Sequence, residues 1–197
     1  TRLRRVSSLK YLSWLTLRVQ LNVRINRNAE VLSYSFKEVF EGFENVGAVR
    51  RIFGDKTDEV LSRTRVVLFP RKGYLAVDDE NGHILVSKPY LQTADEKYIY
   101  LDVIHELVHV KQFLEGKNLF DERYSYVDRP TEVEAYRITV EEARRIGMDD
   151  KQIADYLYVE WITQEEYRRL LRTLGVYTDG INKSAGTRRR GGWLQTK

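Results

Sequence analysis

Apolar and polar residues alternate at every step over residues 15–26, where the sequence reads LTLRVQLNVRIN. Because successive side chains of a β-strand point to opposite faces, this period of two predicts a long strand with one solvent-exposed face. From Asn28 to about Asn45 the apolar residues recur at near-helical spacing, and Asn28 is a suitable N-cap, so we expect a helix there. A second, short helix is expected over residues 55–62.

Three short segments with the composition of β-strands follow, over residues 65–69, 74–79 and 83–87. The last two flank Asn81-Gly82, and an Asn-Gly pair between two apolar runs is a strong signal for a β-hairpin. The pattern therefore predicts a small sheet that contains a hairpin.

Helical spacing dominates the rest of the chain. Gly116 is a plausible end for the first of these helices, Asp128 and Pro130 are suitable for the start of the second, and Thr163 with Glu166 matches a capping box. The four predicted helices cover residues 93–114, 130–147, 149–159 and 163–174.

This order of strands and helices predicts an α+β fold with a helical C-terminal appendage. We divide the chain into a body over residues 1–148, which includes a basic N-terminal arm, and a helical appendage over residues 149–178. Residues 179–197 form a basic tail that we expect to be flexible.

The amino-acid composition limits the kinds of metal site that the chain can form. The 197 residues include no cysteine, so a metal site has to use His, Asp or Glu. The net charge is +4, but residues 1–28 contain seven basic side chains and residues 180–197 contain five, with no acid in either, which leaves −8 for the segment between them. Basic ends suit weak contact with nucleic acid or another anionic surface. No apolar run reaches the roughly 18 residues of a membrane span. No single feature of the sequence identifies a compartment, and a cytoplasmic location is favoured.

Two of the three histidines lie four residues apart in the apolar run LDVIHELVHVKQF, residues 101–113. On a helix, His105 and His109 project from one face about 6 Å apart along the axis, a spacing at which two imidazoles can bind one zinc ion. Glu106 is rotated by about 100° from His105, where its carboxylate can take a proton from a metal-bound water. The His-Glu-x-x-His pattern therefore predicts two metal ligands and a general base.

Catalytic zinc sites usually have a third protein ligand. The helix predicted over residues 130–147 offers Glu132, Glu134, Glu141 and Glu142. Glu132 lies on the apolar face of this helix, where a buried acid is costly unless a cation neutralises it. Glu134 lies on a mostly charged face. We therefore predict Glu132 as the third ligand and keep Glu134 as the alternative.

The sequence HELVH, followed 23 residues later by the Glu-x-x-Ala sequence EVEA that starts at Glu132, resembles the gluzincin branch of zinc metallopeptidases, the minimal gluzincins in particular. The resemblance implies a zincin-like body with a small mixed sheet, an active-site helix and a glutamate helix, and it implies zinc as the cofactor. Many members carry Asp or Asn four residues after the ligand glutamate, as a partner for a ligand histidine. Tyr136 occupies that position here, so Tyr136, Asp128 or Asp102 is expected to orient a histidine instead.

Together, these features predict a zinc-dependent peptidase that hydrolyses peptide bonds of a protein or peptide substrate through a metal-bound water activated by Glu106. Tyr126 and His83 are candidate donors to the developing oxyanion, although structural roles suit both. The alternative is a catalytically weak, zincin-like binding module whose basic termini contact nucleic acid or a protein partner. A hybrid of the two is a peptidase that its basic ends bring to DNA-bound protein.

Overall fold

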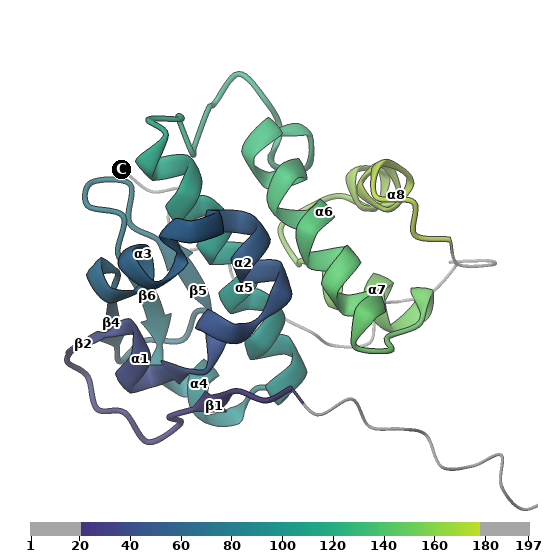
Figure 1. The fold of residues 1–197 in the computed structure, drawn as a ribbon. Helices are drawn as coiled ribbons and strands as arrows, with labels where there is room; N and C mark the ends of the chain where they lie inside the picture. The colour runs from purple at the N-terminus through teal and green to yellow at the C-terminus, as the bar shows by residue number, and fades with distance from the viewer. Residues whose placement is uncertain (1–20, 178–197) are drawn as a thin grey trace, which may run out of the picture.

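The computed structural model describes residues 21–177, which form a mixed α/β structure (Figure 1). Its main sheet has four strands in the order β2-β4-β6-β5. These strands are β2 (Ser33–Ser35), β4 (Arg65–Phe69), β6 (Ile84–Ser87) and β5 (Leu75–Val77). Since β4 and β6 are parallel and the other two pairs are antiparallel, the sheet is small and mixed, in agreement with the predicted α+β class.

Strands β5 and β6 form the predicted hairpin. The backbone N–H of Asp78 donates to the carbonyl of His83 across its end, and Gly82 has a positive φ of 72°. A Cβ added at Gly82 would lie 2.5 Å from the ring of Phe113. The hairpin turn therefore needs glycine both for its backbone conformation and for close packing against the following long helix.

Helices surround the sheet and extend the molecule on one side. Within residues 21–177 the α-helices are α1 (Phe36–Val39), α2 (Gly47–Phe53), α3 (Thr57–Arg63), α4 (Lys88–Thr93), α5 (Glu96–Leu114), α6 (Pro130–Arg145), α7 (Asp150–Leu157) and α8 (Gln164–Thr173). Single 3₁₀ turns are η1 (Phe43–Asn45), η2 (Gly54–Lys56) and η3 (Tyr126–Asp128).

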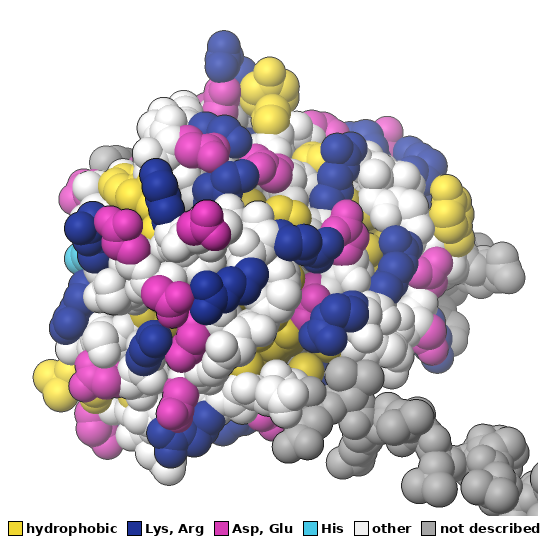
Figure 2. Space-filling view, viewed as in Figure 1, with side chains coloured by type: hydrophobic (Ala, Val, Ile, Leu, Met, Phe, Trp, Pro, Cys, Tyr) yellow, Lys and Arg dark blue, Asp and Glu magenta, His cyan; other side chains and the backbone are white. Residues whose placement is uncertain are grey.

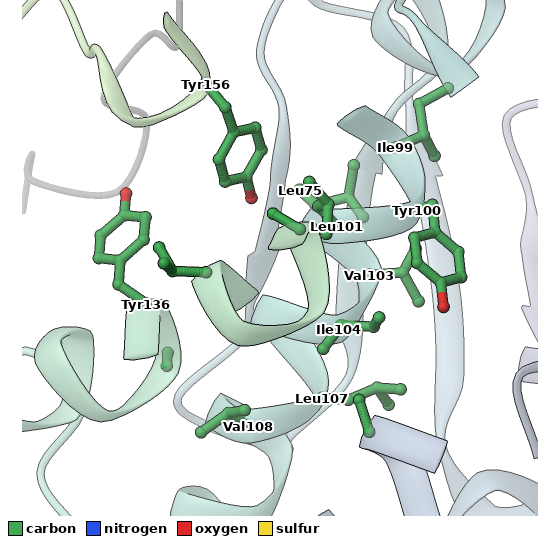
Figure 3. Packing of buried hydrophobic residues seen from close by; sticks show 14 of the residues in the cluster. Leu75, Ile99, Tyr100, Leu101, Val103, Ile104, Leu107, Val108, Tyr136 and Tyr156 are labelled. Carbon is green, nitrogen blue, oxygen red and sulfur yellow. The ribbon is translucent and has the colours of Figure 1, made fainter. Parts of the chain in front are cut away.

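Helix α5 is the centre of the fold. It packs against β5, α2 and α6, and Figure 1 shows it between the sheet and the C-terminal helices. Every residue from 99 to 110 is buried, as expected for a helix that is covered on all sides. Figure 3 shows apolar side chains such as Leu101, Ile104 and Leu107 extending from it into the core.

The predicted N-terminal strand lies only partly within the described chain. Residues 15–20 of that strand, like most of the basic N-terminal arm, are outside residues 21–177. Of the remainder, Arg24–Ile25 forms β1, which pairs antiparallel with β3 (Phe40–Glu41) in a second, two-stranded sheet.

The prediction of one helix over residues 28–45 is wrong. Part of this segment is β2, which pairs with β4, and only the four residues of α1 are α-helical. Gly42 has a φ of 90°, and a Cβ there would lie 2.8 Å from the carbonyl oxygen of Asn22, so the backbone turns away from a helix at this point. Three phenylalanines of the segment pack against one another, which explains their helix-like spacing without a continuous helix.

The two helices that matter for the candidate site begin slightly differently from the prediction. The helix expected over residues 93–114 begins at Glu96 instead, because α4 ends at Thr93 and Asp95 caps α5. Helix α6 begins at Pro130, as predicted, but its N-cap is Arg129 rather than Asp128. The carboxylate of Asp128 instead accepts hydrogen bonds from a serine and an arginine.

The C-terminal helices form close to the ranges that the sequence predicts. Asp149 caps α7, and the capping box of Thr163 and Glu166 starts α8. These helices also pack on the body, because the hydroxyl of Tyr156 in α7 donates a hydrogen bond of 2.8 Å to Asp102 in α5.

The predicted basic tail, residues 179–197, lies outside the described chain. Of the two basic ends that suggested contact with nucleic acid, the structure therefore describes only residues 21–28. In the part of the chain that it does describe, no helix combines the length and the apolar character that a membrane crossing requires.

Candidate metal centre

Two histidines of α5, one helical turn apart, lie side by side. The Nε2 atoms of His105 and His109 are 3.0 Å apart, and the ring centroids are 4.7 Å apart. Both side chains are buried, with exposed fractions of 5% and 8%. Since the spacing of four residues places them on one face of a rigid, buried helix, their relative position is fixed by the backbone.

Glu132 brings a carboxylate to the same point from the first turn of α6. Its Oε2 atom lies 3.3 Å from Nε2 of His105 and 3.6 Å from Nε2 of His109. On its other side, Oε1 faces a guanidinium nitrogen of the buried Arg129 at 3.9 Å. The predicted third ligand therefore lies beside both histidines, because α6 packs against α5 and Gln112 of α5 donates a hydrogen bond to the carbonyl of Thr131 in the first turn of α6.

The donor atoms of these three residues suit a metal ion. They all lie within 4.8 Å of one another, and all three residues are buried. Within the described chain, neither Oε2 of Glu132 nor Nδ1 of His105 makes a hydrogen bond. A buried carboxylate oxygen without a partner is costly, and a cation bound between it and the two imidazoles would remove that cost. The group could therefore hold a metal ion.

Charge couples the three side chains. Burial lowers the pKa of His105, and the nearby His109 adds to this effect. Burial also opposes protonation of His109, but the Glu132 carboxylate outweighs it and raises the pKa of His109 to about 9. Against the opposing effect of burial, the two imidazoles hold the pKa of Glu132 below its ordinary value. The carboxylate of Glu132 therefore stays ionised beside the two imidazoles, which suits it to binding a cation.

Glu106 lies beside this group and faces the sheet. The backbone N–H of Val77, in β5, lies close enough to its carboxylate to counteract part of the effect of burial on its pKa. Burial raises the pKa of Glu106 to about 7; the charge of His109 and the Val77 N–H oppose the rise, and the charge of Glu132 supports it. The predicted base is thus a buried carboxyl group between the histidine pair and an edge strand of the sheet.

No protein-family model, no curated protein and no solved structure matches the chain. The case for a metal centre therefore depends on the donor atoms and on their geometry.

The side chain that contacts Nδ1 of His109 is that of Gln112, which was not among the predicted partners. Nδ1 of His109 lies 2.7 Å from Oε1 of Gln112, a fully buried side chain one turn further along α5. Asp102 accepts hydrogen bonds from two tyrosines, Asp128 binds an arginine of α8, and Tyr136 packs its ring on His105 with centroids 4.5 Å apart. The signal in the sequence was the spacing of three residues, which places Gln112 on the same face of α5 as His109.

Glu134, the alternative ligand, lies outside the group of donor atoms. One of its carboxylate oxygens accepts hydrogen bonds from Nε2 of Gln112 at 2.9 Å and from Nζ of Lys117 at 3.0 Å. The other lies 3.5 Å from Nζ of Lys111. Glu132 and Glu134 are therefore separated as the helical-face argument predicts, one beside the histidines and one among lysines.

The two candidate oxyanion donors have different surroundings. The hydroxyl of Tyr126 lies 2.7 Å from that of Tyr136, and the ring of Trp161 packs against Tyr126 with centroids 5.7 Å apart. Burial raises the pKa of Tyr126 well above its ordinary value and the charge of Glu132 adds to this, so its hydroxyl keeps its proton at neutral pH. His83 lies beside the hairpin turn at the start of β6. Tyr126 is thus the candidate whose environment includes Glu132, one of the three candidate ligands.

Proposed function

We propose that the protein is a zinc-dependent peptidase in which His105, His109 and Glu132 bind zinc and Glu106 is the general base. The observation that carries the proposal is the convergence of three buried donor atoms within 4.8 Å, with Oε2 of Glu132 lacking a hydrogen-bond partner among the described residues. A zincin-like fold is part of the proposal, with α5 as the active-site helix and α6 as the glutamate helix.

The donor set favours zinc over other common cations. Two imidazole nitrogens and one carboxylate oxygen are the protein ligands of one well-known type of catalytic zinc site. Calcium and magnesium prefer sites made of oxygen ligands. Three protein ligands also leave one position of a tetrahedral zinc ion open, which is typical of catalytic rather than structural sites.

Glu106 is placed to move the proton that hydrolysis requires. A zinc ion in such a site is a Lewis acid that makes water more acidic and polarises a carbonyl group. In our proposal, Glu106 takes a proton from the attacking water and delivers it to the amine that leaves when the peptide C–N bond breaks. The side chain of Glu106 is buried, which favours a fixed orientation of the base.

The sheet suggests how a substrate reaches this base. In the described chain, β5 is an edge strand, and its Val77 contacts Glu106 directly. An extended polypeptide can bind an edge strand through main-chain hydrogen bonds, with little dependence on its side chains. We therefore propose an extended or unfolded segment of protein as the substrate, with Tyr126 as a donor to the oxyanion that forms on the attacked carbonyl.

The face shown in Figure 2 gives no support to the alternative of a module that binds nucleic acid. Figure 2 shows lysines and arginines interspersed with aspartates and glutamates over the face in view. Such a mixture is typical of a solvated surface, whereas binding of a phosphate backbone calls for clustered positive charge.

The proposed function is tested by zinc analysis and by cleavage of an unfolded protein. We expect about one zinc per chain in the parent and in Glu106→Gln, with cleavage by the parent only, because the substitution removes the base and retains the ligands. Glu141→Gln is the matched control, since Glu141 is an exposed glutamate of α6 that pairs with Arg51. A zinc-loaded parent that cleaves nothing would favour the binding module, and a parent without zinc would contradict both.

A further inference from the structure

Gln112 occupies a position in which every polar atom of its side chain is used. It is fully buried in α5, and its Oε1 atom lies 2.7 Å from Nδ1 of His109. Its Nε2 atom donates to the backbone carbonyl of Thr131 at 3.0 Å and to a carboxylate oxygen of Glu134 at 2.9 Å. The carboxamide therefore links a histidine of α5 to the first turn of α6, the turn that also carries Glu132.

These partners determine which way the amide group points. A carboxamide has two N–H donors on nitrogen and only acceptor sites on oxygen. Because a backbone carbonyl and a carboxylate can only accept, the nitrogen of Gln112 has to face Thr131 and Glu134. Its oxygen then faces His109, and Nδ1 of His109 has to carry the proton that Oε1 accepts. The lone pair that binds a metal is thereby assigned to Nε2, the atom that faces His105 and Glu132.

Glu134, the acceptor at the far end of this series of hydrogen bonds, lies close to two lysines. Nζ of Lys117 lies 3.0 Å and Nζ of Lys111 lies 3.5 Å from the carboxylate oxygens of Glu134. The glutamate is partly exposed, with 34% of its side chain accessible. A negative acceptor polarises the amide that donates to it, which strengthens the hydrogen bond that the amide oxygen accepts from His109.

We propose that Gln112 is a positioning residue of the metal centre, which fixes the tautomer and the ring orientation of His109, and that Glu134 acts through Gln112. This inference rests on the proposed function, because it assigns these residues a role in metal binding. It also gives Glu134 a role other than that of a ligand. Partners of this kind typically change metal affinity by about 10- to 100-fold when they are removed.

The first test compares zinc affinity, measured by competition with a chelator, in variants of the full chain. Gln112→Met keeps the length of the side chain and removes its hydrogen bonds, and we expect affinity to fall by about 10- to 100-fold. Thr131→Val is the control for damage to packing, since it removes a buried hydroxyl bond to the carbonyl of Leu119 and leaves the Thr131 carbonyl in place. Glu115→Gln removes another partner of Lys111 and Lys117 and should leave affinity unchanged.

The second test observes His109 directly, so that a purely structural role can be distinguished. In ¹H–¹⁵N spectra of the histidine side chains, we expect a slowly exchanging Nδ1–H signal from His109 in the parent, with and without zinc. Gln112→Met should lose this protection. Gln112→Glu puts a second carboxyl group next to Glu134, whereas the swapped pair Gln112→Glu with Glu134→Gln separates the two acids. In its protonated form, which burial beside the Thr131 carbonyl favours, the new carboxyl group donates to that carbonyl and accepts from Nδ1 of His109, as the amide does. We expect the swap to recover the signal and most of the affinity.

The results of the two tests either support or overturn the positioning role of Gln112. Unchanged zinc affinity in Gln112→Met, or an unchanged Nδ1–H signal, would overturn the positioning role. If Gln112→Met does not fold, the swapped pair decides, because failure to recover the His109 signal counts against the proposal in the same way. A parent chain that binds no zinc overturns the proposed function, while the His109 signal of the zinc-free chain still shows whether Gln112 fixes the proton on Nδ1.

Discussion

The two histidines of the candidate centre are neighbours on one helix, yet the atoms behind them differ. Nδ1 of His109 is 2.7 Å from Gln112, at the start of a polar chain that ends in Glu134 and two lysines. Nδ1 of His105 is buried without a hydrogen bond in the described chain, and its ring packs on that of Tyr136. One ring is thus held by hydrogen bonds and the other by aromatic packing. Substitution of the residues that contact His109 and of those that contact His105 is therefore expected to affect zinc binding differently.

The largest difference in zinc binding is expected between substitutions of Glu132 and of Glu134, which lie in the first two turns of α6. Glu132→Ala removes the carboxylate that lies 3.3 Å and 3.6 Å from the two Nε2 atoms, so we expect the chain to retain no zinc against a chelator. Glu134→Ala removes only the acceptor at the far end of the hydrogen bonds that start at His109, and zinc affinity should fall by no more than about 100-fold. Equal losses in the two variants, measured by zinc content after dialysis, would contradict the assignment of Glu132.

A smaller effect, on catalysis alone, is expected from the substitution of Tyr126. Tyr126→Phe removes the hydroxyl that we propose as an oxyanion donor, and kcat for an unfolded protein substrate should fall by about 100-fold. Zinc content should stay unchanged, because Tyr126 does not belong to the group of ligand atoms. His83→Ala, at the hairpin turn, is the control and should keep parental kcat. Loss of activity in His83→Ala with parental activity in Tyr126→Phe would reverse the roles of these residues.

The smallest effect is expected from Tyr136→Phe. This change keeps the ring on His105 and removes the hydroxyl that lies 2.7 Å from that of Tyr126. We expect the free energy of unfolding to fall by about 1 kcal/mol, the usual contribution of one hydrogen bond, and zinc affinity to stay at the parental value. Denaturant titration and chelator competition measure the two quantities. A large loss of zinc affinity here would show that His105 depends on a hydrogen bond after all.

The parts of the site that could be predicted from the sequence are those that helical periodicity alone determines. His105 and His109 share a face because they are four residues apart, and the apolar stripe of α6 separates Glu132 from Glu134. Gln112 obeys the same rule, since it follows His109 by three residues. It was missed because a glutamine has no metal-binding role of its own, so only the buried contacts with Thr131 and Glu134 show what it does.

The part of the fold that could not be predicted is the segment over residues 28–45. Its phenylalanines have helix-like spacing, but β2 gains backbone hydrogen bonds from β4, a strand some 30 residues away in the sequence. Gly42 has a positive φ, which a helix does not allow. Pairing between distant segments leaves little trace in local periodicity, whereas the long buried helix α5 is visible from its own residues.

Diffraction data collected on either side of the zinc absorption edge, from crystals of the full chain purified with zinc, test the central claim most directly. We predict one anomalous peak, about 2.0–2.1 Å from Nε2 of His105 and of His109 and about 2.0–2.2 Å from a carboxylate oxygen of Glu132. A map in which zinc is absent from these three side chains, or in which the two rings turn away from each other, would contradict the account.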